Sequence, residues 1–253
     1  MPVILPEFPE SEYKEPFYVK YFGFEIEGGF DSYHREYSED EEGREVQNNE
    51  YWKHDGSVRC ESGVAGEIAS PKFRIDRMEN FRIFARDNMP IEANSSAGLH
   101  VHVSFNCDEA YSRCMDKEFF NSFEKSVKDY FLENDHKFDE DVTDRFWARI
   151  GNESEYCQDE FCPEYQTNTL WNRYFSSRNG RYTHLNYPYG QHKTIECRLY
   201  PSTTKATELI NMVEFFINFT NSYLKKIPKR ERARRINLNL DDGETMETEV
   251  LCV

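Results

Sequence analysis

Glutamates and histidines occupy alternate positions in short apolar stretches of the chain. In residues 18–27, apolar side chains alternate with Gly23, Glu25 and Glu27. His100 and His102 alternate with apolar residues over 99–105 in the same way. Because successive side chains of a strand point to opposite faces, each stretch predicts a strand with one apolar and one polar face.

Two further stretches carry the same kinds of side chain. Glu67 lies among small and apolar residues in 63–70, which Pro71 ends, and Glu196 and Arg198 alternate within 193–200. Any one of these patterns is also that of an ordinary strand with a solvent-facing side. Four of them in one chain favour polar faces that meet at a common site.

Carboxylates that meet in this way need a counter-charge. Each pair repels by about 3 kcal/mol at ~5 Å and an effective dielectric constant of ~20. A set rich in carboxylate oxygen and poor in nitrogen is the one that Mg²⁺ or Mn²⁺ prefers, whereas Zn²⁺ favours more His or Cys. Such ions can hold the phosphates of a nucleotide and leave arginine for the transferring phosphoryl group.

The remaining periodicity supplies the elements that must position these side chains. We expect helices over residues 75–89, 116–133, 142–150 and from Thr203 or Thr204 to about Leu224. A hairpin is expected from strands over 181–186 and 193–200. The acidic stretches 38–50 and 151–174 are expected to be loops. Residues 1–17 form an extended arm, 18–224 the domain, and 225–253 a tail that is first basic and then acidic.

Composition excludes several classes of protein. The chain has 253 residues and a net charge of −16, which argues against binding to phosphate backbones and favours cations and basic partners. No window approaches the ~20 apolar residues of a membrane-spanning helix. The N-terminus lacks the pattern of a secretory signal, and the seven cysteines are scattered. We therefore expect a cytoplasmic protein with reduced thiols.

Four segments together resemble the amidoligase family, which is similar to glutamate-cysteine ligase and, more distantly, to glutamine synthetase. They are FGFEIEGGF, HDGSVRCESGVAGEIASP, AGLHVHVSF and RYTHLNYPYGQHKTIECRLYPSTT, in this order, and the resemblance covers residues 18–218. It implies an α+β fold in which a curved, largely antiparallel sheet forms an active-site cup and helices pack on its outer face. It also implies an ATP- and Mg²⁺-dependent ligase that joins a carboxylate to an amine through an acyl phosphate.

The resemblance assigns metal ligands residue by residue. It implies that Glu27 and Glu67 bind one Mg²⁺ or Mn²⁺ ion, and that Glu25, His100 and Glu196 bind another beside the ATP phosphates. Glu61 competes with Glu67, which is preferred because it lies on the predicted strand and precedes Ala-Ser-Pro.

Other residues receive catalytic or phosphate-binding roles from the same resemblance. His102 and Arg181 would contact phosphate, and Arg198 would neutralise the transferring phosphoryl group and the acyl phosphate. Asp55 would hold or deprotonate the attacking amine. The family also has an arginine and a Tyr-Cys pair before the final hairpin, which Arg149 and 156–157 match loosely.

Two other functions remain open at this stage. One is a non-catalytic acidic binding protein on a degenerate ligase fold, which the net charge permits. The other is a metal-dependent hydrolase that uses the His-x-His strand, although the other five histidines form no second strand pair. The resemblance leaves the carboxylate and amine open among small molecules, peptides and modified bases, and it permits an oligomer.

Overall fold

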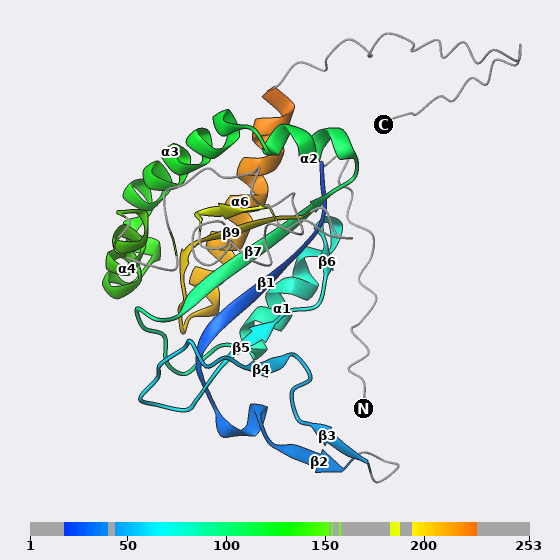
Figure 1. Ribbon diagram of the computed structural model, residues 1–253, viewed down its shortest axis with the longest axis vertical. Coiled ribbons are helices and arrows are strands. Elements are labelled where there is room, and N and C mark those ends of the chain that lie inside the picture. Colours follow the sequence, from blue (N-terminus) through cyan, green and yellow to red (C-terminus); the bar gives the residue numbers. More distant parts are fainter. Residues whose placement is uncertain are drawn as a thin grey trace, which may run out of the picture.

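The long strand β1 (Val19–Phe30) runs diagonally through the sheet that organises the domain (Figure 1). This computed structural model describes residues 18–39, 44–151, 153, 157, 183–187 and 194–226. The strands lie in the order β4 (Trp52–His54), β5 (Val64–Ala69), β1, β7 (Gly98–Phe105), β9 (Thr194–Pro201) and β8 (Leu185–Asn186), and β6 (Phe73–Arg74) also pairs with β1. Every pairing between these strands is antiparallel.

The alternation in β1 explains how one strand serves both core and site. Phe22, Phe24 and Ile26 are at most 2% exposed and lie in the hydrophobic core. The rings of Phe22 and Phe24 meet Phe81 of α1 (Met78–Asp87) edge to face, with centroids 5.2 and 5.9 Å apart. The intervening residues, which include Glu25, are therefore turned to the opposite face.

Except for one short helix, the helices begin and end close to the residues that the periodicity predicts. Besides α1 they are α2 (Asp108–Cys114), α3 (Lys117–Glu133), α4 (Glu140–Ile150) and α6 (Ala206–Lys226). Asp116 caps α3, because its carboxylate accepts a hydrogen bond from the Glu118 N–H at 3.1 Å. The Thr203 hydroxyl accepts from the Lys205 N–H at 3.0 Å just before α6.

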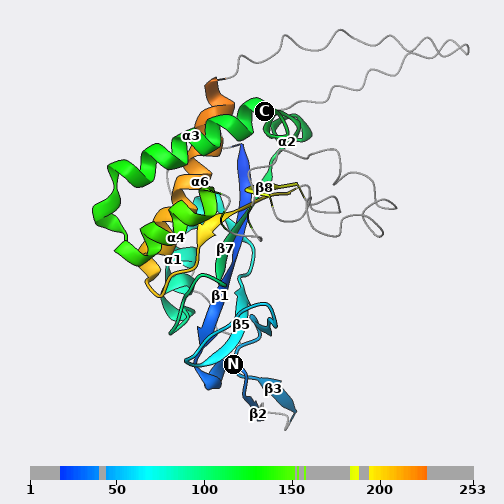
Figure 2. The same cartoon turned by 60° about the vertical axis from the view of Figure 1, so that its left-hand side comes forward.

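Aromatic rings join these helices to one another. Phe123 of α3 meets Phe216 of α6 with centroids 5.2 Å apart, and Phe131 of α3 stacks on Phe146 of α4 at 3.7 Å. Figure 2 shows α6 lying alongside the sheet between α1 and α3. The described part of the chain is thus a mixed α/β structure with an antiparallel sheet and five α-helices.

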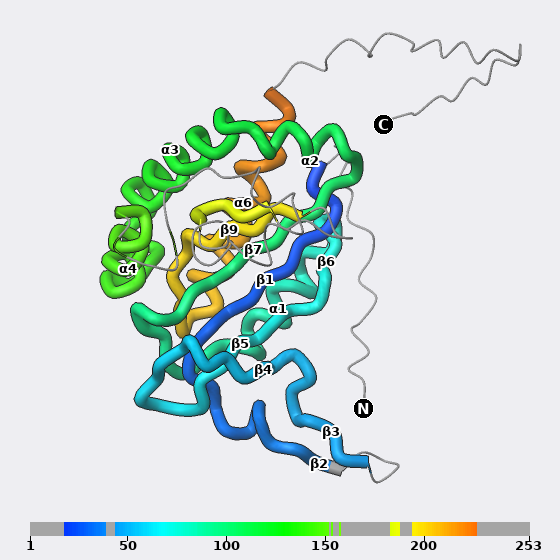
Figure 3. Tube along the Cα trace, in the orientation of Figure 1, coloured from blue at the N-terminus to red at the C-terminus, as the bar shows by residue number. Residues whose placement is uncertain are grey.

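The expected loop over residues 38–50 is wrong where the structure describes it. β2 (Tyr37–Glu39) pairs with β3 (Glu45–Gln47), and Tyr37 lies opposite Gln47 (Figure 3). The side chains of Tyr37 and Val46 are exposed, so main-chain pairing and not burial forms this hairpin. This segment has no alternation of apolar residues, so the sequence did not predict the hairpin.

Three other short elements were not expected, namely β4, β6 and α2. The predicted hairpin is confirmed in part, because β8 pairs with β9, although residues 181–182 and 188–193 lie outside the described residues. The arm over 1–17, most of the expected loop 151–174 and the tail beyond 226 also lie outside them. Among the helices described, none combines the length and the apolar character needed to cross a bilayer.

Candidate metal centre

Strand register brings the predicted carboxylates and histidines onto one face of the sheet. Glu27 of β1 lies opposite Glu67 of β5, and Glu25 lies opposite His100 of β7. His102 of β7 in turn lies opposite Glu196 of β9. Because directly opposed residues point to the same face, four neighbouring strands contribute to one polar surface, called here the polar face.

A β-bulge in β9 sets the place of Arg198. Leu99 pairs with Tyr200 and Val101 pairs with Cys197, so two residues of β9, at 198 and 199, stand opposite His100 alone. Tyr200 therefore reaches the core, while Arg198 stays beside Glu196. Alternation without the bulge would have put Tyr200 on the polar face.

Carboxylate and imidazole atoms form two compact groups on this face. The first group is Glu27, Asp55 and Glu67, and the second is Glu25, His102 and Glu196. In each group, the potential ligand atoms lie within 4.8 Å of one another. Either group could supply three ligands to a single ion.

His100 lies between the two groups. Its Nδ1 is 3.4 Å from Glu25 Oε2 and 3.7 Å from Glu196 Oε1, and its Nε2 is 3.7 Å from Glu27 Oε1. His102 Nε2 is 3.7 Å from Glu25 Oε2. The geometry therefore groups His102 with Glu25 and Glu196, where the resemblance implied His100, and it adds Asp55 to Glu27 and Glu67.

The main chain and neighbouring side chains fix the Glu27 carboxylate. Its Oε2 accepts a hydrogen bond of 2.6 Å from the Gly98 N–H, and its side chain is 11% exposed. A Cβ atom at Gly98 would lie 3.1 Å from Arg149 Nη2 and 3.2 Å from His100 Nε2. A glycine at this position thus lets the strand approach Glu27 and the side chains of Arg149 and His100.

Arg149 bonds the main chain beside the site and does not pair with a described carboxylate. Its guanidinium donates to the carbonyl oxygens of Arg198 at 3.2 Å and Ala97 at 2.9 Å. Burial lowers the pKa of Arg149 from its usual value. By bonding both β9 at its bulge and the residue before β7, this side chain joins the two strands that carry the histidines and Arg198.

Glu196 is held by two donors. Arg198 Nη1 donates to its Oε1 at 2.5 Å, and Asn186 Nδ2 of β8 donates to its Oε2 at 2.6 Å. Burial would raise the pKa of Glu196, but the charges of Arg198 and the two histidines outweigh burial and lower it. Glu196 is therefore an ionised carboxylate in an almost fully buried position.

The pKa shifts of the ionisable side chains differ in direction across the polar face. Hydrogen bonds from His100 and His102 hold the pKa of Glu25 far below its usual range. Burial would lower the pKa of His102, but Glu25 and Glu196 raise it. At the other side, burial and the nearby Glu25 carboxylate raise the pKa of Glu67, even though Lys53 Nζ lies 3.7 Å from its Oε1.

The structure also places the remaining predicted residues. Among the residues described, Glu67 and not Glu61 belongs to the group around Glu27. The Glu61 N–H instead donates to the Glu92 carboxylate at 2.9 Å. The Asp55 carboxylate accepts from the Ser57 N–H and hydroxyl at 2.8 and 2.7 Å. Arg181 lies outside the described residues.

Sequence reasoning gave no role in the site to Asn186, Gly98 or Lys53. The sequence could have indicated Asn186. When the two strands of the predicted hairpin over 181–200 pair in the observed register, Asn186 lies opposite Glu196. Gly98 and Lys53 carry no local signal of this kind. Their roles depend on pairings between segments far apart in the chain.

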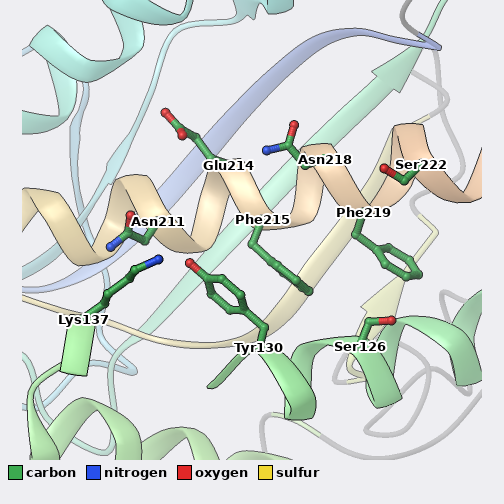
Figure 4. Close-up of a pocket in the computed structure, with 9 residues that line it drawn as sticks. All are labelled: Ser126, Tyr130, Lys137, Asn211, Glu214, Phe215, Asn218, Phe219 and Ser222. Carbon is green, nitrogen blue, oxygen red and sulfur yellow. The ribbon is translucent and has the colours of Figure 1, made fainter. Parts of the chain in front are cut away.

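A separate groove of about 480 Å³ lies between α3 and α6 (Figure 4). Its floor includes the stacked rings of Tyr130 and Phe215, whose centroids are 4.3 Å apart. Its carboxylate, Glu214, receives two hydrogen bonds from Arg82. None of its lining residues belongs to the polar face.

No protein-family model, curated protein or solved structure matches the chain.

Proposed function

We propose that the protein is an ATP- and Mg²⁺-dependent carboxylate-amine ligase. The observation that carries this proposal is the pair of adjacent ligand groups on the polar face, bordered by the Arg198 guanidinium. The resemblance to the amidoligase family supports it, and in this reading the curved sheet forms a cup around the polar face with helices on its outer side. Use of ATP agrees with the cytoplasmic location expected from the sequence.

The two ligand groups fit hard divalent cations. One consists of three carboxylates, and the other of two carboxylates and one imidazole. Mg²⁺ and Mn²⁺ prefer such oxygen-rich sets, with metal–oxygen distances of about 2.0–2.6 Å for hard cations in general. Two ligand atoms on opposite sides of an ion with bonds of about 2.1 Å lie about 4.2 Å apart, so groups whose ligand atoms are within 4.8 Å of one another are compact enough for one ion each. When bound, these ions would neutralise the ATP phosphates and orient them.

The proposed reaction has two steps. A carboxylate oxygen of the substrate attacks the γ-phosphorus of ATP, the bond to the bridging oxygen breaks, and ADP leaves. The amine nitrogen of the second substrate then attacks the carbonyl carbon of the acyl phosphate. The nitrogen loses a proton, the bond between carbon and the phosphate oxygen breaks, and phosphate leaves with the amide formed.

The residues of the polar face have distinct parts in these steps. Arg198, held by Glu196, is positioned to neutralise negative charge on the transferring phosphoryl group. Asp55 is half-buried, whereas Glu27 of the same ligand group is buried, and Asp55 could accept the proton of the attacking amine. Glu27, His100 and His102 lie between Arg198 and Asp55 and keep the two ligand groups in place.

Calorimetric titration of a non-hydrolysable ATP analogue, with and without Mg²⁺, tests the proposal without knowledge of the other substrates. We expect Mg²⁺-dependent binding to the wild type and a loss of at least tenfold in affinity in Glu27→Gln. Glutamine keeps an oxygen that can accept from the Gly98 N–H, so the fold should persist. Glu133→Gln, an exposed carboxylate on α3, is the matched control and should bind as the wild type does.

Other outcomes would point to the other functions. Absence of nucleotide binding under every metal condition rejects the ligase. Tight Zn²⁺ binding without nucleotide binding would favour a hydrolase using His100 and His102. If the chain bound neither metal nor nucleotide but captured a basic partner, the acidic binding protein would be the better reading.

A further inference from the structure

The polar face continues past the ligand groups toward the start of β1. Tyr21 and Gly23 alternate with core residues as Glu25 does, so all three share this face. Gly23 lies opposite His102 and Tyr21 opposite Ser104. At a rise of ~3.3 Å per residue, Tyr21 is about 13 Å from Glu25 along the strand.

A β-bulge turns a lysine onto the same face. The register between β1 and β7 shifts between Val19 and Tyr21, which leaves Lys20 as the extra residue. Val19 and Phe22 are both buried in the core, so neither Lys20 nor Tyr21 between them occupies the core face. Lys20 Nζ lies 5.3 Å from the centre of the Tyr21 ring.

A second lysine approaches the same ring from the neighbouring strand segment. Lys72 directly precedes β6, which pairs with the start of β1, and its Nζ lies 4.4 Å from the centre of the Tyr21 ring. Both lysines are exposed, and within the described part of the chain neither has a carboxylate partner. Two cations thus flank one partly exposed aromatic ring, an arrangement called here the Tyr21 platform.

Between the platform and the ligand groups, β1 adds no side chain to the polar face, because the residue there is Gly23. A Cβ atom at Gly23 would lie 3.3 Å from Ser70 Oγ and 3.6 Å from the Pro71 carbonyl oxygen. Ser70 is itself fixed, because its Oγ accepts from the Phe24 N–H at 2.8 Å. Gly23 therefore adds no side chain of its own to the polar face, and a ligand extended along β1 would pass over Gly23 beside Ser70 Oγ.

Charge changes sign along this path. The ligand groups at one end are rich in carboxylates and would attract divalent cations with their phosphates, whereas the platform offers two ammonium groups and a π-face. A nucleoside triphosphate has matching ends, because its outer phosphates bind metal, its inner phosphate is anionic and its base stacks on aromatic rings. A short anionic substrate would match only one end.

We propose that the Tyr21 platform binds the nucleoside end of the nucleotide, with the Tyr21 ring stacking on the base and Lys20 and Lys72 contacting the innermost phosphate. This inference rests on the proposed use of ATP and adds a subsite to it. The ligand class is a purine or pyrimidine nucleotide extended along β1. The carboxylates at the far end would engage the outer phosphates through the bound cations.

The test compares a non-hydrolysable ATP analogue with inorganic tripolyphosphate, which lacks base and ribose, in Mg²⁺ by calorimetry. We expect Tyr21→Leu to weaken binding of the analogue about tenfold, equivalent to ~1.4 kcal/mol, and to leave tripolyphosphate affinity unchanged. The double variant Lys20→Gln/Lys72→Gln should weaken both probes and reduce the salt dependence of binding. Tyr37→Leu, on an exposed tyrosine of β2, should change neither affinity.

The outcomes separate this inference from the proposed function. If the wild type binds the analogue and Glu27→Gln abolishes binding, but Tyr21→Leu and the double lysine variant bind normally, the platform assignment is overturned and the ligase proposal stands. Equal losses for both probes in Tyr21→Leu would also overturn stacking, since tripolyphosphate has no base. If the wild type binds neither probe, both proposals fail together. Circular dichroism of each variant identifies any loss of fold.

Discussion

Individual residues of the site are fixed mainly by main-chain contacts, which makes Gly98 informative. Its N–H donates to Glu27, and the space at its Cα is bordered by Arg149 and His100. A methyl group here would need both side chains to move by a few tenths of an ångström. The ends of the two side chains can move, so the expected effect is displacement of ligands and not loss of the fold.

Gly98→Ala should therefore weaken Mn²⁺ binding by a factor of three to ten, while overpacking lowers the free energy of unfolding by about 1 kcal/mol. Calorimetry and urea unfolding measure the two effects. Gly56→Ala is the control, because its nearest neighbour would be His54 Cε1 at an ordinary 3.8 Å. Wild-type Mn²⁺ affinity in Gly98→Ala would contradict metal binding by Glu27, whose carboxylate the Gly98 N–H holds.

The buried pair of Glu196 and Arg198 gives a second test at this scale. Arg198→Met removes the cation that balances Glu196, and such a loss in a buried pair costs about 3–5 kcal/mol. If a divalent cation binds Glu25, His102 and Glu196, saturating Mn²⁺ should restore part of that loss, because a ligand of the folded state stabilises it. Urea unfolding with Mn²⁺ and with chelator measures the difference.

The half-buried pair of Arg82 and Glu214, which is more exposed than that of Glu196 and Arg198, supplies the matched control. Arg82→Met should cost no more than about 1 kcal/mol, and Mn²⁺ should change its stability only as it changes that of the wild type. Loss of stability in Arg198→Met that Mn²⁺ leaves untouched would argue against a cation at Glu196.

At the scale of elements, the sequence predicted what local periodicity encodes. The alternation in β1, the cap at Asp116 and the stripes of α3 and α6 all gave elements close to those observed. The two ligand groups were not predictable in detail, because they depend on strand pairings between distant segments. The bulge opposite His100 and the approach of Asp55 to Glu27 leave no periodic trace in the chain.

A buried contact between β8 and α3 gives a prediction about pH. His184 precedes β8, is 0% exposed and pairs through Nδ1 with Glu124 of α3. Burial would lower the pKa of His184, but Cys157 and Glu124 outweigh burial and raise it to about 9. The folded state therefore binds a proton more tightly than the unfolded chain, whose histidine pKa is about 6.5.

The stability from this proton should be fully present below about pH 6.5 and should disappear as the pH rises through about 9. Its size is on the order of 3 kcal/mol. Urea unfolding of Glu124→Gln at pH 6 and pH 10 checks the sign, since the deficit relative to wild type should be large at pH 6 and small at pH 10. The same deficit at both pH values would contradict a charged His184, and Glu133→Gln on the same helix is the control.

For the whole molecule, the net charge of −16 means that any added salt should favour the compact state by screening repulsion. The polar face adds a stabilising effect that is specific to divalent cations, because its carboxylates form two groups that can bind ions as ligands. Mg²⁺ should therefore raise the melting temperature more than NaCl does at equal ionic strength. In Glu27→Gln/Glu196→Gln this excess should vanish, while the response to NaCl remains. An equal excess in both proteins, measured by differential scanning calorimetry, would mean that Mg²⁺ acts on the overall charge and that the polar face holds no metal.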